Sequence, residues 1–290
     1  MDYNKLFHAI KNIEFEGDFD KVIETDSAFA VIKENTDESL FNYVSIKKVD
    51  NVMGVLNAFL SADKFLKVNN KSPKLLFPIL SNSKNVFNEM VKNNLFTVDF
   101  YENVLVFTEK AFLNKKFEYE SDIEFSQTTN AQEYAQAVCD NFNSLIASDD
   151  LYGGLEEEYI PGIINAFKPK DNLIALHYQA VKNGQIISTM SVSIDKNTNF
   201  AGLANASTHG NFRGKRISSK LLQMAISDAY NLGAKQIFFY TEAGNSSENA
   251  YKKSGFEVKF KIAMLEPNYE KIREATSENS NCAKEGELWE

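Results

Sequence analysis

The chain has 290 residues, 43% of them hydrophobic and 24% charged, a composition typical of a soluble globular protein with room for two domains. Its formal net charge of −9 argues against binding to nucleic acid or an anionic membrane, because phosphate groups would be repelled over most of the surface. Two distant cysteines and three histidines show no spacing typical of a disulfide framework or a zinc site, so we expect no metal.

No apolar run approaches the ~18 residues of a membrane-spanning helix, and the first residues lack the order of a secretory signal. We therefore expect a cytoplasmic protein that binds neither membrane nor nucleic acid and is a monomer or homodimer.

The first half of the chain alternates strands and helices. A helical stretch carries Val52, Leu56, Phe59 and Leu66 on one face. The strands are predicted at 40–46, 74–80 and 95–109, with a second helix at 84–94. The polar segment 114–122 is predicted to be a linker.

The second half repeats this alternation, beginning with a strand at about 122. Asn183-Gly184 separates two β-branched runs, which indicates a hairpin. Ile217, Leu221, Ala225 and Ala229 recur every four residues and predict a helix. Strands are predicted at 172–181, 185–194, 199–208, 235–242 and 256–265, and a short helix at 246–254. Residues 277–290 show no periodicity, and we expect 269–290 to be a C-terminal tail.

The two halves also align with each other. Residues 88–100 placed over 248–260 match Lys92 to Lys252, Phe96 to Phe256 and two further positions, always 160 residues apart. Together with the matching order of elements, this predicts an internal repeat.

The segment "THGNFRGKRISSKLL" holds two of the three arginines of the chain, Arg213 and Arg216. A strand ends there, a glycine-containing turn follows and a helix begins. Unpaired N–H groups at a helix start favour an anion such as phosphate, which an arginine grips in a bidentate way. The alternative is a solvated basic helix start.

This segment resembles the acyl-coenzyme A pyrophosphate loop of the GNAT N-acetyltransferase superfamily, whose pattern is Arg or Gln, two residues, Gly, one residue, then Gly or Ala. Arg213 stands at the arginine position, Arg216 at the first glycine and Ser218 at the second. The Arg216 side chain either projects outward to a phosphate or obstructs the loop.

A second resemblance lies downstream in "EAGNSSENAYKKSGF", with Asn245, Tyr251, Gly255 and Phe256 at family positions and an Asn-to-Tyr interval of six instead of the more usual seven. The likeness covers about 150 residues. It implies an α/β (α+β) fold of two GNAT-like mixed-sheet domains in tandem: an acetyl-coenzyme A-binding domain at 122–268, and a degenerate GNAT-like domain at 1–115 without the arginine loop.

The resemblance implies that an amine attacks the thioester of acetyl-coenzyme A directly, and that a backbone N–H near Asn205 or Ala206 polarises the carbonyl. Tyr251 is the expected acid for the leaving thiolate, and Glu242 the expected base, acting through water. The alternatives are a packing tyrosine on a short helix and a solvated glutamate at a strand end. His209 is a second candidate base, or a turn residue beside the loop. The expected coenzyme-binding residues are Asn205, Ala206, Ser207, Arg213, Gly214, Lys215, Arg216, Ile217, Ser218, Ser219 and Asn245.

For the acceptor amine, the segment 151–162 corresponds to the variable region of the family. Glu156 is expected to attract a cationic amine, and Tyr152 and Tyr159 to line the acceptor cleft; the alternatives are a solvated helix face and packing residues. An amino acid, polyamine, aminoglycoside, peptide or protein lysine remains open as acceptor.

Two functions compete with acetyl transfer. The first is a non-catalytic acyl-coenzyme A sensor or interaction module. The second is a tandem-domain aminoacyl or peptidyl transferase, whose dependence on charged tRNA fits poorly with the net charge of −9.

Overall fold

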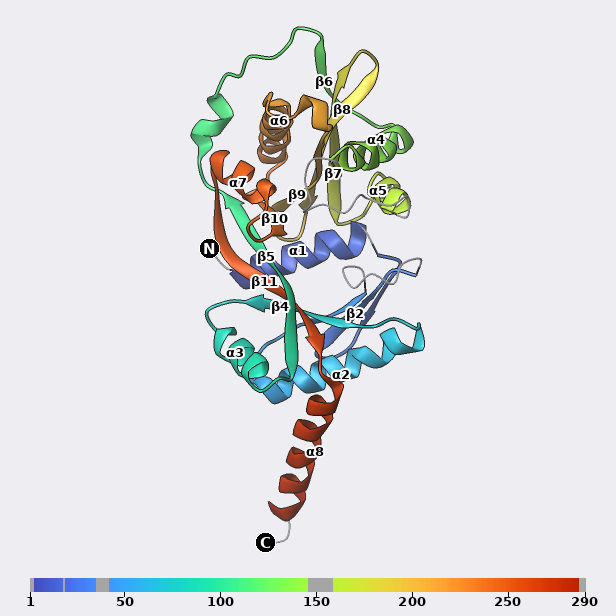
Figure 1. Ribbon diagram of the computed structural model, residues 1–290, viewed down its shortest axis with the longest axis vertical. Coiled ribbons are helices and arrows are strands. Elements are labelled where there is room, and N and C mark those ends of the chain that lie inside the picture. The colour runs from blue at the N-terminus through green and yellow to red at the C-terminus, as the bar shows by residue number, and fades with distance from the viewer. Residues whose placement is uncertain (1–2, 18, 35–41, 146–158, 287–290) are drawn as a thin grey trace. The chain divides into compact units, whose positions relative to one another are not determined.

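The computed structural model describes residues 3–17, 19–34, 42–145 and 159–286 (Figure 1). The chain forms two compact units. Unit 1 consists of Met1–Asp18 and Val104–Lys259, and unit 2 consists of Phe19–Asn103 and Phe260–Glu290.

Unit 1 is built on a mixed sheet. Strands β6, β7, β8 and β9 pair antiparallel in that order, β10 pairs parallel with β9, and β5 is the next neighbour of β10. The strands are β5 (Phe96–Phe107), β6 (Ile123–Gln127), β7 (Leu173–Lys182), β8 (Gln185–Asp195), β9 (Phe200–Thr208) and β10 (Gln236–Glu242). The helices are α1 (Tyr3–Gly17), α4 (Ala131–Asn143), α5 (Ile160–Asn165), α6 (Ile217–Asn231) and α7 (Ser246–Lys253), with short 3-10 turns η1 (Lys110–Asn114) and η3 (Gly210–Phe212).

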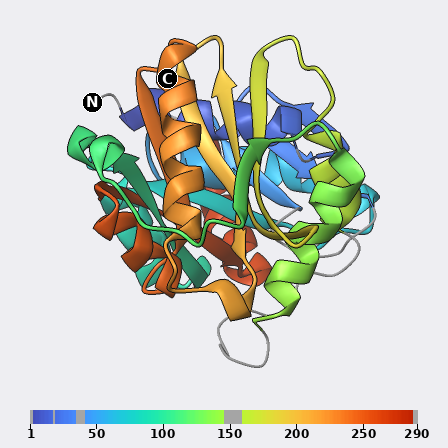
Figure 2. The same ribbon diagram turned by 90° about the horizontal axis from the view of Figure 1, so that it is seen from above.

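Helices cover both faces of the unit 1 sheet. Figures 1 and 2 show α6 on one side of β7, β8 and β9, and α4 and α5 on the other. The alternation along β8 explains this arrangement, because Met190 and Val192 join the core under α6, whereas Ser191 contacts Tyr134 of α4.

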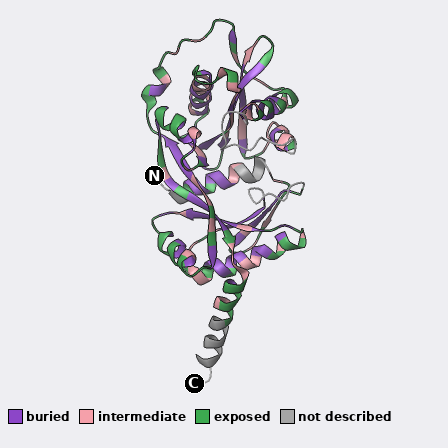
Figure 3. Ribbon diagram, in the orientation of Figure 1, coloured by how far each residue is buried: buried purple, intermediate pink, exposed green. Residues whose placement is uncertain are grey.

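Unit 2 has a similar succession of pairings with one antiparallel strand fewer. Strands β1, β2 and β3 pair antiparallel, β4 pairs parallel with β3, and β11 pairs antiparallel with β4. The elements are β1 (Lys21–Glu24), β2 (Ala28–Ile32), β3 (Tyr43–Ile46), α2 (Val52–Val68), β4 (Lys74–Ile79), α3 (Lys84–Lys92), β11 (Phe256–Pro267) and α8 (Tyr269–Gly286). In both units a helix connects the two parallel strands, and each unit buries its own apolar core, seen as purple ribbon in Figure 3.

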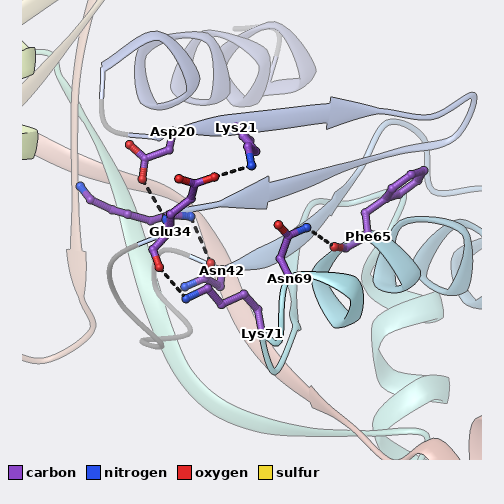
Figure 4. A network of polar contacts seen from close by, with 8 residues as sticks. Asp20, Lys21, Glu34, Asn42, Phe65, Asn69 and Lys71 are labelled. Atoms are coloured by element: carbon purple, nitrogen blue, oxygen red, sulfur yellow. Dashed lines mark hydrogen bonds and ion pairs between the residues drawn. The ribbon is translucent and has the colours of Figure 1, made fainter.

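A polar network closes one end of the β1–β2 ladder in unit 2 (Figure 4). The Glu34 N–H donates to Asp20 at 2.8 Å, Lys71 Nζ donates to the Glu34 carbonyl at 3.0 Å, and Lys21 pairs with the Glu34 carboxylate. Asn42 accepts from the buried Lys33 N–H at 3.1 Å. These bonds satisfy backbone groups where the strands end, so we assign the network to structure.

These observations confirm the predicted α/β class with two mixed-sheet domains in tandem. They also agree with the predicted repeat: β5 and β11 each have 12 residues and begin at the aligned Phe96 and Phe256.

The boundaries differ from the predicted domains, 1–115 and 122–268. Residues 1–18 join unit 1 because α1 packs on β8 and β9, burying Leu6 and Ile10, and Asn12 donates to Asp195 at 3.3 Å. The last strand of each half is also divided between the units. The boundary falls within β5 at Val104, where unit 1 begins, and within β11 at Phe260, where unit 2 resumes.

The expected tail at 269–290 needs correction, because Tyr269–Gly286 is helical. Ile272 is fully buried in the unit 2 core, and Tyr269 donates to the buried Asp63 of α2 at 2.7 Å. Two apolar anchors near the start of α8 therefore fix a helix whose remaining sequence is polar.

Candidate functional site

The site is a cavity of about 150 Å³ in unit 1, beside the point where β9 and β10 separate. Their parallel register ends at Gly202 and Phe238, although the strands continue to Thr208 and Glu242. A Cβ on Gly202 would lie 2.9 Å from the Phe238 ring, so the last paired position requires glycine. The cavity is lined by Phe142, Leu145, Met190, Ala206, Ser207, Thr208, Arg213, Ser218, Ser219, Leu222, Ser246, Ser247, Ala250, Tyr251 and Ser254.

A β-bulge in β9 forms one wall of the cavity. Thr189 faces Ser207 and Ser191 faces Ala204, so Asn205 and Ala206 together oppose Met190. Asn205 has a left-handed backbone, with φ of 51°. Its side chain turns away from the cavity wall and donates to Ser191 at 3.3 Å, whereas Ala206 lies on the wall. The bulge therefore interrupts the ladder beside the cavity.

His177 lies behind this bulge, with its Nδ1 2.9 Å from the Ser191 hydroxyl and its ring stacked on Phe167 at 3.6 Å. Burial lowers the pKa of His177 to about 4, so the imidazole is neutral at neutral pH. His177 does not line the cavity, and we assign it to packing.

The arginine segment also lines the cavity. Arg213 lines the cavity, and its guanidinium donates to the Ser246 hydroxyl at 3.4 Å. Gly214 is left-handed with φ of 77°, and Ile217, the first residue of α6, is buried in the core. Ser218 and Ser219, in the first turn of α6, lie on the cavity wall.

Arg216 has a left-handed backbone, with φ of 61°, a conformation that favours glycine. It precedes α6 without a side-chain cap, so the first N–H groups of this helix receive no bond from the Arg216 side chain. The guanidinium lies 5.5 Å from the centre of the Phe117 ring, in a neighbouring groove of about 480 Å³, and does not line the cavity. The geometry thus favours the outward alternative for Arg216.

Lys215 also points away from the cavity. Its ammonium pairs with Glu120 at 2.8 Å, and Lys182 pairs with the same carboxylate. Hydrogen bonds from Lys182 and then Lys215 lower the pKa of Glu120 to about 2. The charge of Lys215 is therefore engaged by an acidic partner on the loop before β6. Neighbouring His209 accepts from the Asn211 N–H at 3.3 Å, as a turn residue would.

Asn245 begins α7 and is used within the fold. Its side-chain oxygen Oδ1 accepts from the Glu248 N–H at 2.9 Å, and its side-chain Nδ2 donates to the Thr241 hydroxyl at 2.7 Å. The Glu248 side chain accepts from the N–H of Gly244, the residue before the cap, at 2.6 Å, so the carboxylate binds the turn that leads into the helix. Asn245 does not line the cavity, but the next two residues, Ser246 and Ser247, do.

Tyr251 brings a phenol to the cavity wall. The residue is only 6% exposed, its ring stacks on Phe239 at 3.8 Å, and its hydroxyl has no hydrogen-bond partner within the described protein. Burial raises the pKa of Tyr251, so the phenol stays protonated through the neutral and mildly alkaline range. A buried, unpartnered donor on a cavity wall is the group that a polar ligand would satisfy.

The remaining predicted residues lie elsewhere. Glu242 is exposed at the end of β10 and is not on the cavity wall. Tyr159 packs against the small cluster between α4 and α5, around Tyr134 and Ile163. Tyr152 and Glu156 lie outside the described residues.

Several cavity residues were not predicted from the sequence. The large apolar ones come from three separate elements: Phe142 and Leu145 at the end of α4, Met190 on β8 and Leu222 on α6. No local pattern distinguishes them from core residues. Ser246 and Ser247 follow Asn245 directly, and their position in the first turn of α7 was the available signal.

Unit 2 offers a comparison within the same chain. Its helix α2 also joins two parallel strands, but the Asn51 side chain caps it by accepting from the Gly54 N–H at 2.8 Å. The start of α2 is thus satisfied by the protein itself, whereas that of α6 has no side-chain cap.

Two further findings concern the described part of the chain alone: no group of three His, Cys, Asp or Glu residues is placed to hold a metal ion, and no helix has the length and apolarity needed to cross a membrane.

Comparison with known proteins identifies the class. Residues 141–256 match the sequence model of the acetyltransferase (GNAT) family. No curated protein sequence is significantly similar to the chain.

Solved structures share the fold over both units. A GCN5-related N-acetyltransferase from Kribbella flavida matches with a TM-score of 0.65 at 12% identity, covering 91% of this chain and 95% of that one. A tandem GNAT protein from the clavulanic acid biosynthesis pathway matches with a TM-score of 0.61 at 9% identity, covering 84% and 80%. A conserved protein of unknown function from Staphylococcus epidermidis matches with a TM-score of 0.59 at 12% identity, covering 89% and 97%.

The predicted resemblance to the GNAT superfamily is thereby confirmed: residues 141–256 carry a GNAT-family domain, and the chain as a whole has the fold of a tandem GNAT protein.

Proposed function

We propose that unit 1 transfers an acetyl group from acetyl-coenzyme A to a primary amine, by direct attack of the amine on the thioester. The observation that carries this proposal is one cavity lined by Arg213, by the first turn of α6 and by Tyr251, whose buried hydroxyl has no hydrogen-bond partner among the described residues. A candidate anion site and a buried proton donor thus line the same cavity. Acyl transfer from coenzyme A requires both.

The pyrophosphate would bind at the start of α6. The Arg213 guanidinium is exposed and faces the cavity, and the helix start supplies N–H groups and the positive end of the helix dipole. Arginine is suited to this role because its planar fork makes two parallel bonds to phosphate oxygens. Ser218 and Ser219 add hydroxyl donors in the same turn.

Tyr251 would donate the proton. When the amine nitrogen attacks the carbonyl carbon, the carbon–sulfur bond breaks and the departing thiolate takes the phenol proton. The amine releases its own proton to solvent, or through water to Glu242 at the end of β10. A neutral phenol is a weak acid for a thiolate, so the cavity must help, and the nearby helix end and Arg213 provide positive potential.

A second candidate function is an acyl-coenzyme A sensor without turnover. Two observations favour it: Arg216 replaces the glycine of the loop pattern, and Asn245 is engaged as a helix cap. Both functions need the same donor, and they differ in catalysis alone.

The test is release of free thiol from acetyl-coenzyme A in the presence of a panel of primary amines. We expect Tyr251→Phe to lower kcat by ~10²-fold, because general acids typically contribute ~10²–10⁴-fold, with the KM for acetyl-coenzyme A nearly unchanged. Tyr230→Phe is the matched control. It also removes a tyrosine hydroxyl, but from a residue of α6 that does not line the cavity, so this variant should retain full turnover. Donor binding without thiol release for any amine would instead support the sensor.

A further inference from the structure

Side-chain hydroxyls of β8 hold the carbonyl groups of the bulged strand β9. Thr189 Oγ1 donates to the Asn205 carbonyl at 2.8 Å, and Ser188 Oγ donates to the Ser207 carbonyl at 2.7 Å. Both hydroxyl-bearing residues are fully buried. At the bulge, the strand is therefore fixed by side chains in addition to backbone pairing.

The bonds around Thr189 run in one direction. A carbonyl oxygen only accepts, so the single Thr189 proton goes to Asn205. The Ser207 hydroxyl, 2.6 Å from Thr189 Oγ1, must then donate to Thr189, and it accepts in turn from the Asn141 amide at 3.1 Å. The chain Asn141, Ser207, Thr189, Asn205 carbonyl thus has a defined direction, and such a chain polarises its last acceptor.

This direction sets the orientation of the next N–H group. The described chain has no cis peptide bond, so the Asn205 carbonyl and the Ala206 N–H point in opposite directions within their shared peptide plane. The carbonyl is drawn toward Thr189, on the face where α4 supplies Asn141. The Ala206 N–H therefore points toward the other face, where Ala206 packs against the α6 core and lines the cavity.

We propose that Thr189 is a positioning residue for acyl transfer: by holding the Asn205 carbonyl, it directs and polarises the Ala206 N–H as the donor to the thioester carbonyl. This inference rests on the proposed function. Thr189 is not on the cavity wall and acts solely through the Asn205–Ala206 peptide. Without the Thr189 hydroxyl, the Asn205 carbonyl loses the hydrogen bond that sets its direction. Asn205 has a left-handed backbone at a bulge, where the ladder of backbone bonds is interrupted.

The experiment combines calorimetric titration of acetyl-coenzyme A with difference infrared spectra of acetyl-coenzyme A carrying a 13C thioester carbonyl. Thr189→Val removes the hydroxyl at nearly constant volume, and Thr189→Ser keeps it. Thr198→Val is the matched control, because it deletes another buried threonine hydroxyl of unit 1, bonded to Asp195 at 2.6 Å and remote from the cavity.

In the wild type, the carbonyl band of the bound thioester should lie below that of free acetyl-coenzyme A, because an accepted hydrogen bond weakens the C=O bond. Thr189→Val should return the band toward the free value and reduce kcat at least ~10-fold, since losing an oxyanion donor outright costs ~10²–10³-fold. Its Kd for acetyl-coenzyme A should stay within a few-fold. Thr189→Ser should restore band and rate, and Thr198→Val should leave both unchanged.

The outcomes separate the two proposals. If the wild type does not bind acetyl-coenzyme A, the proposed function is wrong and this inference with it. If the wild type binds and shows a lowered band that Thr189→Val leaves in place, only the positioning role is overturned. Should Thr189→Val fail to fold, Ser207→Ala removes the proton donated to Thr189 and is expected to raise the band by a smaller amount; an unchanged band in that variant also contradicts the inference.

Discussion

At the scale of single residues, Arg216 occupies a left-handed backbone position that favours glycine. The backbone retains the left-handed conformation, at a cost of ~1–2 kcal/mol for a residue with a Cβ. The side chain is accommodated because it extends over Phe117 and stays off the cavity wall. Strain is thus retained where the loop turns into α6, as is common at functional sites.

Arg216→Gly should therefore raise the free energy of unfolding by about 1 kcal/mol relative to Arg216→Ala, because both remove the guanidinium but only glycine relieves the left-handed strain. Chemical denaturation of the two variants measures this difference. Equal stabilities would show that the backbone at 216 is unstrained.

The Arg216 case also shows where sequence reasoning at this scale ends. The arginine and serine positions of the loop were predictable, because their spacing resembles a known pattern. The direction of a long side chain was not, since the aromatic ring that receives it, Phe117, is almost 100 residues away in a segment predicted to be a linker. Similarly, Lys215 was expected at the coenzyme, but Glu120 from the same segment engages it.

At the scale of elements, the strands and helices from residue 172 onward were predicted to within a few residues at most boundaries, because turn residues mark them, whereas no ranges were predicted for α4 and α5. Asn183 and Gly184 both have positive φ, as the hairpin signal requires. In the first half, β1, β2 and α1 were missed. The two strands have four and five residues, too few for a periodic signal, and the polar residues of α1 obscure its apolar face.

Helix α7 contributes three residues to the cavity wall, Ser246, Ser247 and Tyr251, and its N-terminal cap fixes where the helix begins. We expect Asn245→Ala to lower the free energy of unfolding by about 1 kcal/mol through the lost cap, and to weaken acetyl-coenzyme A binding only indirectly. Asn245→Asp should keep most of the stability, because a carboxylate also caps a helix start. Thermal melts and donor titrations of both variants provide the measurement; full stability combined with lost binding in Asn245→Ala would instead make Asn245 a direct ligand.

At the scale of the whole molecule, both halves contain antiparallel strands followed by a parallel pair that one helix connects, but the start of that helix differs. In unit 2 the protein caps α2 with Asn51, and in unit 1 the corresponding helix α6 has no side-chain cap. The repeat was predictable from aligned residues near the ends of the halves. The exchange of terminal segments was not, because it depends on which sheet each segment packs against and leaves no local pattern.

Because each unit includes a segment from the other half of the chain, a fragment cut between the halves should not fold alone. A fragment of residues 1–115 lacks Phe260–Glu290, and therefore lacks β11, the antiparallel partner strand of β4, and the buried Ile272. We expect this fragment to show no cooperative thermal transition by circular dichroism, whereas the full chain should show one. A cooperative melt of the fragment would mean that the residues 1–115 fold independently.

The central claim is that the cavity in unit 1 binds acetyl-coenzyme A through Arg213 and the start of α6. Its most direct test is calorimetric titration of acetyl-coenzyme A into the full chain, repeated with Arg213→Ala and with Arg213→Lys, which keeps the charge but not the planar fork. We predict measurable binding by the wild type, weaker binding by Arg213→Lys and the weakest by Arg213→Ala. An absence of binding heat in the wild type, together with no rise in melting temperature at saturating ligand, would contradict the account.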